Sequence, residues 1–368
     1  MQAVMLVGLS LCTAASHAQS SVTLYGLISI GVGYTSNQGG KSLYSMISGP
    51  EQLPRWGIKG KEDLGGGTSA VFTLENGFSI TNGSTSQGGR MFGRQAYVGL
   101  SSTRLGTLTL GRQYDELSQQ LYWSESAAQF AAFGTHVGDN DNIFDTVRFN
   151  NSVRYTVQPI TGLSLAGQYA FSNSTNGFSN NSGFSFGASY VNGPLKFGAA
   201  MAQYNQPASL DNPQGAVDNA SYGFTSPFVQ SPGGSAVARQ RISAAGLSYD
   251  FGIVQATLGY SNVLFDYQDS TGLRLQNLEA TLTHQFTPAL LAGVSYAYTF
   301  GRYSAGPEPR YAQINIGGVY SLSKRTDLFL VGMYQRAGGA ATHAQIFSTS
   351  PSSSTSEFLV TTGMRLKF

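Results

Sequence analysis

Carboxylates are the groups in this sequence that gather most densely, and they do so in one stretch. Residues 111–154 contain six of them, on Asp115, Glu116, Glu125, Asp139, Asp141 and Asp145. Most of this stretch shows neither the alternation of a strand nor the sustained period of a helix, which indicates a loop over about residues 114–147. A loop that long inside an ordered domain is usually functional. Carboxylates held opposite arginines would create a transverse electric field, which acts on ions and dipolar solutes.

Arginines occur near this loop on strand faces that alternation defines. Arg148 and Arg154 share one polar face of a predicted strand, with Phe149 on the other face. In an earlier strand, Arg55 and Lys59 likewise share a face. These cations are the natural partners of the loop carboxylates, and arginine keeps its charge even beside other cations.

Other chemistry finds less support in the sequence. A hydrolase needs a histidine beside a nucleophile, but after residue 18 only His136, His284 and His343 remain, so we expect no enzyme. The segment 138–142 resembles a calcium loop but lacks the twelfth-position glutamate and the flanking helices, which favours a plain turn and no metal. No glycine-rich phosphate loop and no basic stripe are evident at a net charge of +2, so we predict no cofactor and no nucleic acid.

Residues 1–18 have an apolar core and end in Ser16-His17-Ala18, a small-x-small pattern. We therefore predict a secretory signal peptide, with Gln19 as the first residue of a mature domain over 19–368. The single cysteine, Cys12, falls inside this segment. The mature chain would then contain no disulfide and no thiolate site.

The amino-acid composition indicates which type of structure surrounds the charged stretch. Only 11% of residues are charged, against about 25% in soluble domains, and 46 are glycine. No run of 18 apolar residues follows the first twenty, so no transmembrane helix is predicted. Polarity that comes from Ser, Thr, Asn, Gln and Gly suits strands with lipid on one side and water on the other.

Alternation predicts the strands directly and is clearest at the two ends. Val22, Leu24 and Ile28 share one face of the first strand, and Met364 and Phe368 share one face of the last. Between them, seven short turns alternate with eight long loops, the first long loop at 35–53, which gives sixteen strands. An even number of strands with short turns on one side and long loops on the other is typical of an all-β, antiparallel transmembrane β-barrel.

Aromatic residues cluster at the predicted strand ends, as in the interfacial girdles of membrane barrels. They are Tyr34, Phe72, Phe78, Tyr155, Tyr190, Tyr249, Phe251, Phe286, Phe300, Tyr320, Phe329 and Phe368. The alternative is the core of a soluble sandwich, which the uncharged polar faces disfavour. Because an arginine that faces lipid at the midplane costs about 2–4 kcal/mol, Arg55 and Arg148 should face the lumen.

Several motifs together resemble the general porins of Gram-negative bacteria, in their beta-proteobacterial branch. They are Ser21-Val22-Thr23-Leu24-Tyr25-Gly26, Arg55-Trp56-Gly57-Ile58-Lys59-Gly60, Gly93-Arg94-Gln95-Ala96-Tyr97-Val98-Gly99-Leu100, Leu110-Gly111-Arg112-Gln113, Asn150-Asn151-Ser152-Val153-Arg154-Tyr155 and Gly363-Met364-Arg365-Leu366-Lys367-Phe368. The resemblance implies a homotrimer of sixteen-stranded barrels in the outer membrane, each with its third loop folded inward as a constriction. In place of the family's loop motif this sequence has residues 129–134, Gln-Phe-Ala-Ala-Phe-Gly.

The resemblance also implies a ladder of arginines, which by motif position are Arg55, Arg94 and Arg148. With the parity argument, the predicted basic wall of the constriction is Arg55, Lys59, Arg94, Arg148 and Arg154. The predicted acidic side is Glu75, Asp115, Glu116, Glu125, Asp139 and Asp141. Arg112 has the parity of outward residues, and the resemblance places it near a subunit contact with the neighbour's loop 80–90.

These features predict a general diffusion porin that prefers anions and passes ions and small hydrophilic solutes. Lipid and lipopolysaccharide of the outer membrane would surround it. One alternative is a channel with a saturable site for organic anions or sugars, whose aromatic slide would begin at Tyr114, Tyr122, Trp123, Phe130 and Phe133. A secreted all-β adhesin is a more distant alternative, which the charge-poor strand faces argue against.

Overall fold

The structure, a computed structural model, describes residues 20–368 except 132, 176, 225, 305 and 307. The predicted signal peptide, 1–18, and Cys12 lie outside the described residues. Within the part described, no helix has the length and apolar character needed to cross a membrane.

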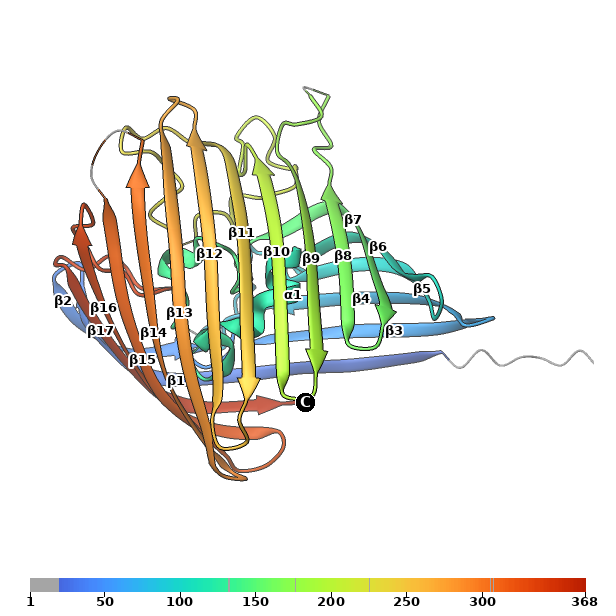
Figure 1. Cartoon of the computed structure of the whole chain (residues 1–368), viewed down its shortest axis with the longest axis horizontal. Helices are drawn as coiled ribbons and strands as arrows, with labels where there is room; N and C mark the ends of the chain where they lie inside the picture. The colour runs from blue at the N-terminus through green and yellow to red at the C-terminus, as the bar shows by residue number, and fades with distance from the viewer. Residues whose placement is uncertain (1–19, 132, 176, 225, 305, 307) are drawn as a thin grey trace, which may run out of the picture.

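Antiparallel strands make up most of the chain and form one continuous sheet (Figure 1). They are β1 (Ser21–Gln38), β2 (Lys41–Ser48), β3 (Arg55–Gly65), β4 (Thr68–Gly77), β5 (Gln95–Ser102), β6 (Gly106–Tyr114), β7 (Arg148–Ile160), β8 (Leu163–Ala170), β9 (Ser182–Asn192), β10 (Leu195–Asn205), β11 (Val237–Asp250), β12 (Gln255–Tyr267), β13 (Gly272–Thr287), β14 (Leu290–Tyr303), β15 (Pro309–Ser321), β16 (Thr326–Gly339) and β17 (Ser356–Lys367).

The seventeen strand segments occupy sixteen positions around the sheet. β3 pairs with residues 21–27 of β1, and β2 pairs with residues 30–38 of the same strand. The two segments therefore form one interrupted strand, broken at residues 49–54. The predicted number of sixteen strands is confirmed.

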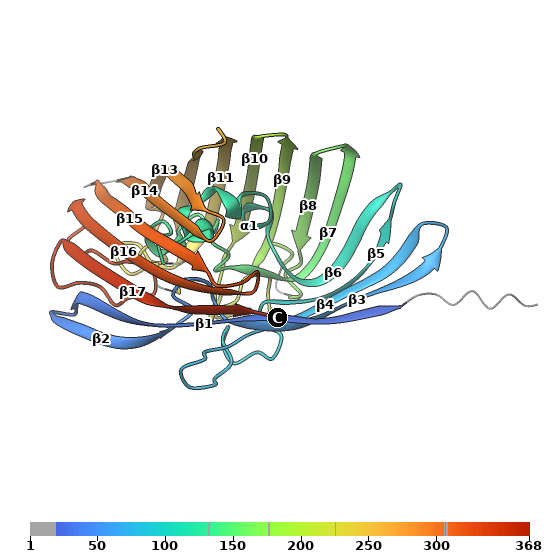
Figure 2. The same cartoon turned by 90° about the horizontal axis from the view of Figure 1, so that it is seen from below.

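The first and last strands close the barrel. β17 pairs with β1 from Leu27 opposite Lys367 to Thr35 opposite Leu359. Beyond this ladder, Gly26 and Phe368 exchange two backbone hydrogen bonds of 3.1 and 3.0 Å. Figure 2 shows the two ends of the sheet side by side. Closure leaves no unpaired sheet edge among the described strands, as a hydrocarbon environment requires.

The predicted long loop at 35–53 is wrong. β1 continues to Gln38, and a two-residue turn at Gly39 and Gly40 leads straight into β2. Both glycines have a positive φ, of 60° and 101°, which suits the tight turns that join twisted hairpins.

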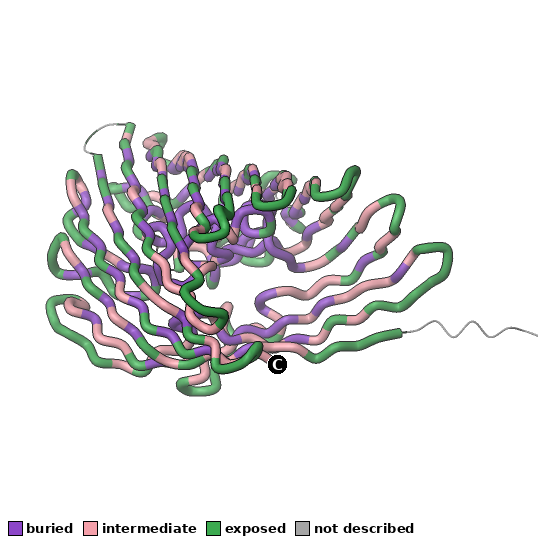
Figure 3. The backbone as a smooth tube through the Cα atoms, turned by 60° about the horizontal axis from the view of Figure 1, so that its bottom comes forward, coloured by how far each residue is buried: buried purple, intermediate pink, exposed green. Residues whose placement is uncertain are grey.

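The two faces of each strand differ in burial, as the alternating colours along the tube in Figure 3 show. In β13, Leu278 and Leu282 are about half exposed, whereas Glu279 and Thr281 are 1% exposed. Large apolar side chains thus lie on the outside, where lipid is expected, and polar side chains lie on the inside.

The connection between β6 and β7 contains most of the helical structure in the described chain. Its helices are α1 (Glu116–Leu121), η1 (Tyr122–Ser124), α2 (Ser126–Gln129) and η2 (Val137–Asp139). Asp115 caps α1 by accepting a hydrogen bond from the backbone N–H of Ser118 at 3.1 Å. We call residues 115–147 the acidic loop.

Candidate functional site

The acidic loop packs against the strands through two apolar clusters. Leu117 and Leu121 of α1 are fully buried in a cluster that includes Ala200 and Ala202 of β10. Farther along the loop, Phe130 is buried in a second cluster with residues of β15 to β17. This second cluster includes Phe329, which is 3% exposed and not part of an outer girdle as predicted, because it shares the inward face of β16 with Val331.

Glycines of the strands allow the loop to approach closely. A Cβ atom on Gly187 of β9 would lie 2.6 Å from Cγ of Gln120 and 3.0 Å from Cβ of Glu116. A Cβ atom on Gly293 of β14 would lie 2.4 Å from a ring carbon of Phe130. Any larger residue at these positions would displace the loop from the strands.

Four charged residues meet where the loop ends, and we call them the arginine cluster: Glu75, Arg94, Asp145 and Arg148. Nε of Arg94 lies 2.8 Å from Glu75, and its Nη2 lies 3.2 Å from Asp145. Arg148 pairs with the same Asp145 at 2.7 Å. The ring of Tyr114 packs against both guanidinium groups, at 5.6 and 5.0 Å from its centroid. This cluster has no net charge when all four groups are ionised.

The alternation of inward and outward side chains, from which the strand faces were predicted, is broken beside Arg148. Phe149 was expected on the outer face, but its side chain is fully buried, and its ring contacts Tyr204 at 5.4 Å. The register between β6 and β7 shifts here, and Asn151 has a left-handed φ of 52°. This bulge adds a residue and reverses the alternation.

Arg154 ties α1 to β7. Its Nε and Nη2 donate to the two oxygens of Glu116 at 2.5 and 3.2 Å. Gln120, one turn later in α1, donates to Glu116 at 2.9 Å. Glu116 is fully buried, and the fork-like pairing gives both of its oxygens a charged partner.

Arg55 and Lys59 differ from the other predicted cations. Within the described chain, neither has a carboxylate within ion-pair distance. Arg55 donates to the carbonyl oxygen of Leu53 at 3.1 Å, and Nζ of Lys59 lies 5.3 Å from the centroid of the Tyr25 ring. Lys59 is exposed and Arg55 is half-buried.

Asp115 and Asp139 do not meet the predicted arginines. Asp115 accepts hydrogen bonds from Tyr204 at 2.5 Å and from Asn142 at 3.1 Å. Asp139 accepts from the backbone N–H groups of Phe144 and Thr146 at 3.1 and 3.0 Å. Burial raises the pKa of Asp115 to about 6, and burial with nearby carboxylates raises the pKa of Asp139 well above its ordinary value.

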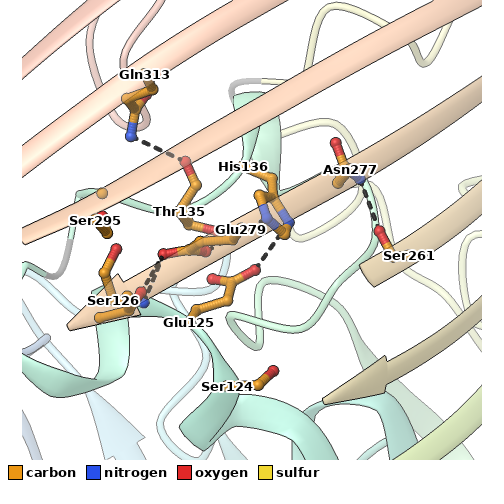
Figure 4. Close-up of polar contacts among 12 residues, drawn as sticks. Ser124, Glu125, Ser126, Thr135, His136, Ser261, Asn277, Glu279, Ser295 and Gln313 are labelled. Carbon is orange, nitrogen blue, oxygen red and sulfur yellow. Dashed lines mark hydrogen bonds and ion pairs between the residues drawn. The ribbon is translucent and has the colours of Figure 1, made fainter. Parts of the chain in front are cut away.

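Glu125 and Asp141 instead converge on a histidine. We call His136, Glu125, Asp141 and Glu279 the histidine cluster; its members are at most 2% exposed. Nδ1 of His136 lies 2.8 Å from Asp141 and 3.1 Å from Glu125, and its Nε2 lies 3.4 Å from Glu279 of β13. Figure 4 shows Glu125 against the imidazole, and Glu279 bonded to Ser126.

The carboxylates of this cluster have different protonation tendencies. Burial raises the pKa of Glu125 to about 7. Asp141 is equally buried, but His136 and hydrogen bonds that include one from Ser261 lower its pKa. Burial opposes a charge on His136, yet Asp141 and Glu125 together raise its pKa well above the ordinary value.

Arg112 is buried and pairs within its own chain. Its Nη1 lies 2.8 Å from Asp218 in the connection between β10 and β11, and its Nε donates to the carbonyl oxygen of Gly93 at 2.8 Å. Arg90, in the connection between β4 and β5, approaches the same Asp218 at 3.4 Å. Asp218 thus ties the connection between β10 and β11 to strand β6 through Arg112 and to the connection between β4 and β5 through Arg90.

Two carboxylates of these networks, Asp218 and Glu279, are absent from the sequence-based prediction, and Asp145 enters it only as one of the six loop acids. Asp145 lies among the acidic residues of the loop, but nothing in the sequence sets it apart from them. Glu279 carries a usable signal, because it is an acid that alternates with Leu278 and Ala280 and must therefore face inward. Asp218 lies in a long connection whose course the sequence does not define.

The sequence and the fold are both similar to those of known outer-membrane proteins. A family model described as Gram-negative porin matches residues 3–340. An outer membrane porin protein of Bordetella pertussis is 30% identical, over 88% of this chain and 90% of the relative. Among solved structures, the anion-selective porin from Comamonas acidovorans is 24% identical with a TM-score of 0.76, over 95% of this chain and 100% of that one. The trimer form of OmpT from Vibrio cholerae is 12% identical with a TM-score of 0.68, over 95% and 99%. The chain belongs to the Gram-negative porin family.

Proposed function

We propose that this chain is a general diffusion porin of the Gram-negative outer membrane, exported by a signal peptide at residues 1–18. It would pass ions and small hydrophilic solutes passively, with lipid and lipopolysaccharide around its apolar face. Family membership supports this role, as do the closed sheet and the difference between its two faces. The porins of this family are channels and not enzymes, so we assign no catalysis.

In this proposal the acidic loop is the inward-folded third loop and narrows the pore. Its contacts support that role, because Leu117, Leu121 and Phe130 pack against apolar side chains on the inward face of the strands. The ion pair between Glu116 and Arg154 and the hydrogen bond between Ser126 and Glu279 tie the same loop to β7 and β13.

Anion preference rests on one observation, which is the difference in pairing among the predicted cations. Arg94, Arg148 and Arg154 each have a carboxylate partner, so their charge is largely balanced. Arg55 and Lys59 have no such partner among the described residues. These two cations, which form no direct ion pair, would lower the barrier for anions in the pore. The similar porin from Comamonas acidovorans is named anion-selective.

The burial of three of the five aromatics in the predicted slide disfavours the solute-specific alternative, while Tyr122 and Trp123 are only partly buried. Tyr114, Phe130 and Phe133 are 7%, 0% and 4% exposed. Side chains buried to this extent anchor the loop and do not present rings to a sugar. The closed barrel likewise disfavours an adhesin.

We also propose a homotrimer, in keeping with the trimeric form of the similar OmpT. Arg112 would stabilise the subunit contact indirectly, without touching the neighbouring subunit. Through Asp218 it shares an ion-pair network with Arg90, and so orders the connection 78–94 that would reach the neighbour.

Planar bilayer recordings test the proposal. We expect stepwise insertion of open channels in threes and a reversal potential in a salt gradient that reports anion preference. Conductance that saturates with one solute would favour a specific channel instead. Absence of conductance from a protein whose gel mobility is heat-modifiable would contradict the porin assignment.

A further inference from the structure

The histidine cluster has more negative groups than its single imidazole can balance. Three carboxylates surround His136, and all four side chains are at most 2% exposed. Even with the imidazole protonated, three ionised carboxylates would leave two negative charges buried. Uncompensated buried charge is costly, so such a group of side chains needs protons or a cation.

Several atoms of the cluster lack a hydrogen-bond partner. Both carboxylate oxygens of Glu125 are buried without one, as are Oδ1 of Asp141 and Oε2 of Glu279. Buried polar atoms are almost always satisfied in folded proteins. Three of these oxygens belong to Glu125 and Asp141, which approach the Nδ1 side of the imidazole, and they point to a missing partner there.

We propose that Glu125, His136 and Asp141 bind a divalent transition-metal ion such as Zn²⁺. A ligand atom from each residue lies within 4.8 Å of those from the other two. Nδ1 of His136 is the natural nitrogen ligand, because both Glu125 and Asp141 approach that side of the ring.

The remaining contacts match the supporting shell of a metal site. With Nδ1 on the metal, Nε2 would carry the proton 3.4 Å from Oε2 of Glu279, and a hydrogen bond between them would satisfy two atoms that otherwise lack a partner. A carboxylate that accepts from the far nitrogen of a liganding histidine fixes the ring and raises its basicity. Asp141 is oriented in turn by Ser261 at 2.5 Å and Asn277 at 3.2 Å.

The donor set distinguishes between classes of cation. One imidazole nitrogen with two carboxylates suits Zn²⁺ and its neighbours in the first transition row. Calcium instead takes six to eight oxygen ligands. Asp139, the other acid of the segment that resembles a calcium loop, uses both oxygens to accept backbone N–H groups.

A metal here would fasten the acidic loop to the strands. Glu125 and Asp141 lie on either side of Phe130 along the loop, and their supporting residues Ser261, Asn277 and Glu279 come from β12 and β13. One ion would thus connect two parts of the loop and hold them beside two neighbouring strands. Because the cluster is buried, loading is expected during refolding.

The test uses the full mature chain with His284→Gln and His343→Gln, so that His136 is its only histidine. The protein is refolded from a chelator-treated denatured state into detergent with Zn²⁺, then dialysed. We expect one zinc per protomer by elemental analysis. Co²⁺ in place of Zn²⁺ should give a visible ligand-field spectrum.

Variants assign the ligands. His136→Gln should abolish stoichiometric binding, and Glu279→Gln should weaken it by about 10–100-fold. Glu357→Gln is the control, a buried carboxylate of β17 outside both the cluster and the acidic loop, and should bind zinc as the parent does. Zinc retained by His136→Gln, no stoichiometric zinc in the parent, or binding of Ca²⁺ alone would each overturn the proposal.

If His136→Gln does not fold, the parent protein still decides the question. Loaded with Cu²⁺, it should show electron paramagnetic coupling to one imidazole nitrogen. Absence of that coupling would overturn the assignment. Neither readout depends on conduction, so failure of this proposal is distinguishable from failure of the porin assignment.

Discussion

Arg94 and Glu75 form an ion pair of 2.8 Å in which the guanidinium group is completely shielded from solvent. Glu75 also accepts hydrogen bonds from Tyr25 and Tyr114, at 2.9 and 3.2 Å. Arg94 reaches onward to Asp145 at the end of the acidic loop. It is therefore a positioning charge that holds the loop end against β4, and it does not itself contact ions in solution.

Replacement of Arg94 should destabilise the barrel more than it changes selectivity. Arg94→Gln leaves Glu75 buried without its charged partner, and breaking a buried pair in this way costs about 3–5 kcal/mol. The double variant Arg94→Gln/Glu75→Gln should recover much of this loss. Thermal midpoints from heat-modifiable gel mobility measure both. A double variant no more stable than Arg94→Gln alone would show that the pair is not coupled.

Removal of the two unpaired cations should weaken anion preference. A unit charge 4 Å from a passing ion in water contributes about 1 kcal/mol, so each loss should reduce anion permeability roughly fivefold. We expect Arg55→Gln/Lys59→Gln to shift the reversal potential in a salt gradient toward cations. Lys324→Gln, in the short turn between β15 and β16, is the control. An unchanged reversal potential in the double variant would remove these residues from the selectivity mechanism.

Much of the barrel can be predicted from the sequence because strands that separate lipid from water must alternate. The pairing of Ile30 with Met364 joins two outward apolar faces that alternation identifies. Alternation fails where the backbone departs from regular pairing. The bulge at Asn151 places Phe149 on the face opposite to the predicted one. The turn at Gly39 has only two residues, so the composition of the sequence does not reveal where β1 ends and β2 begins.

The site is less predictable than the barrel, because the path of the acidic loop decides which charged side chains pair with each other. The sequence identifies Arg94 and the carboxylates of the acidic loop as charged candidates, but not which of them meet. Glu125 faces His136, and Asp145 faces Arg94, although both acids belong to the same loop. Such choices depend on the loop path, which here is set by apolar anchors such as Phe130.

A methyl group on Gly187 should push α1 away from the strands and reduce conductance. The added Cβ would lie 2.6 Å from Gln120 and 3.0 Å from Glu116, closer than packed carbon atoms tolerate. Since α1 has the strands behind it, it can move only away from them, which in the proposed arrangement of the acidic loop narrows the pore. Single-channel conductance of Gly187→Ala should fall below that of wild type. Gly338→Ala is the control, because nothing lies within 4 Å of its added Cβ. Equal conductance in both variants would contradict close packing of α1.

Acid should release the connection between β10 and β11 through Asp218. Burial alone would raise the pKa of Asp218, but Arg112 and Arg90 lower it below the ordinary value of 3.8. A carboxyl group whose pKa is lower in the folded state stabilises the fold above 3.8, and this contribution is lost as the pH falls below that value. Hydrogen exchange of residues 206–236, corrected for intrinsic rates, should therefore accelerate in that acid range.

Substitution of Asp218 should remove this acid step. Asp218→Asn leaves Arg112 buried without a charged partner, so exchange in residues 206–236 should be fast even at neutral pH and should change little on acidification. Asp211→Asn is the matched control, since Asp211 lies exposed in the same connection, and it should keep the acid step of the wild type. Persistence of the step in Asp218→Asn would assign it to another carboxyl group and would leave the pairing with Arg112 without a role in holding this connection.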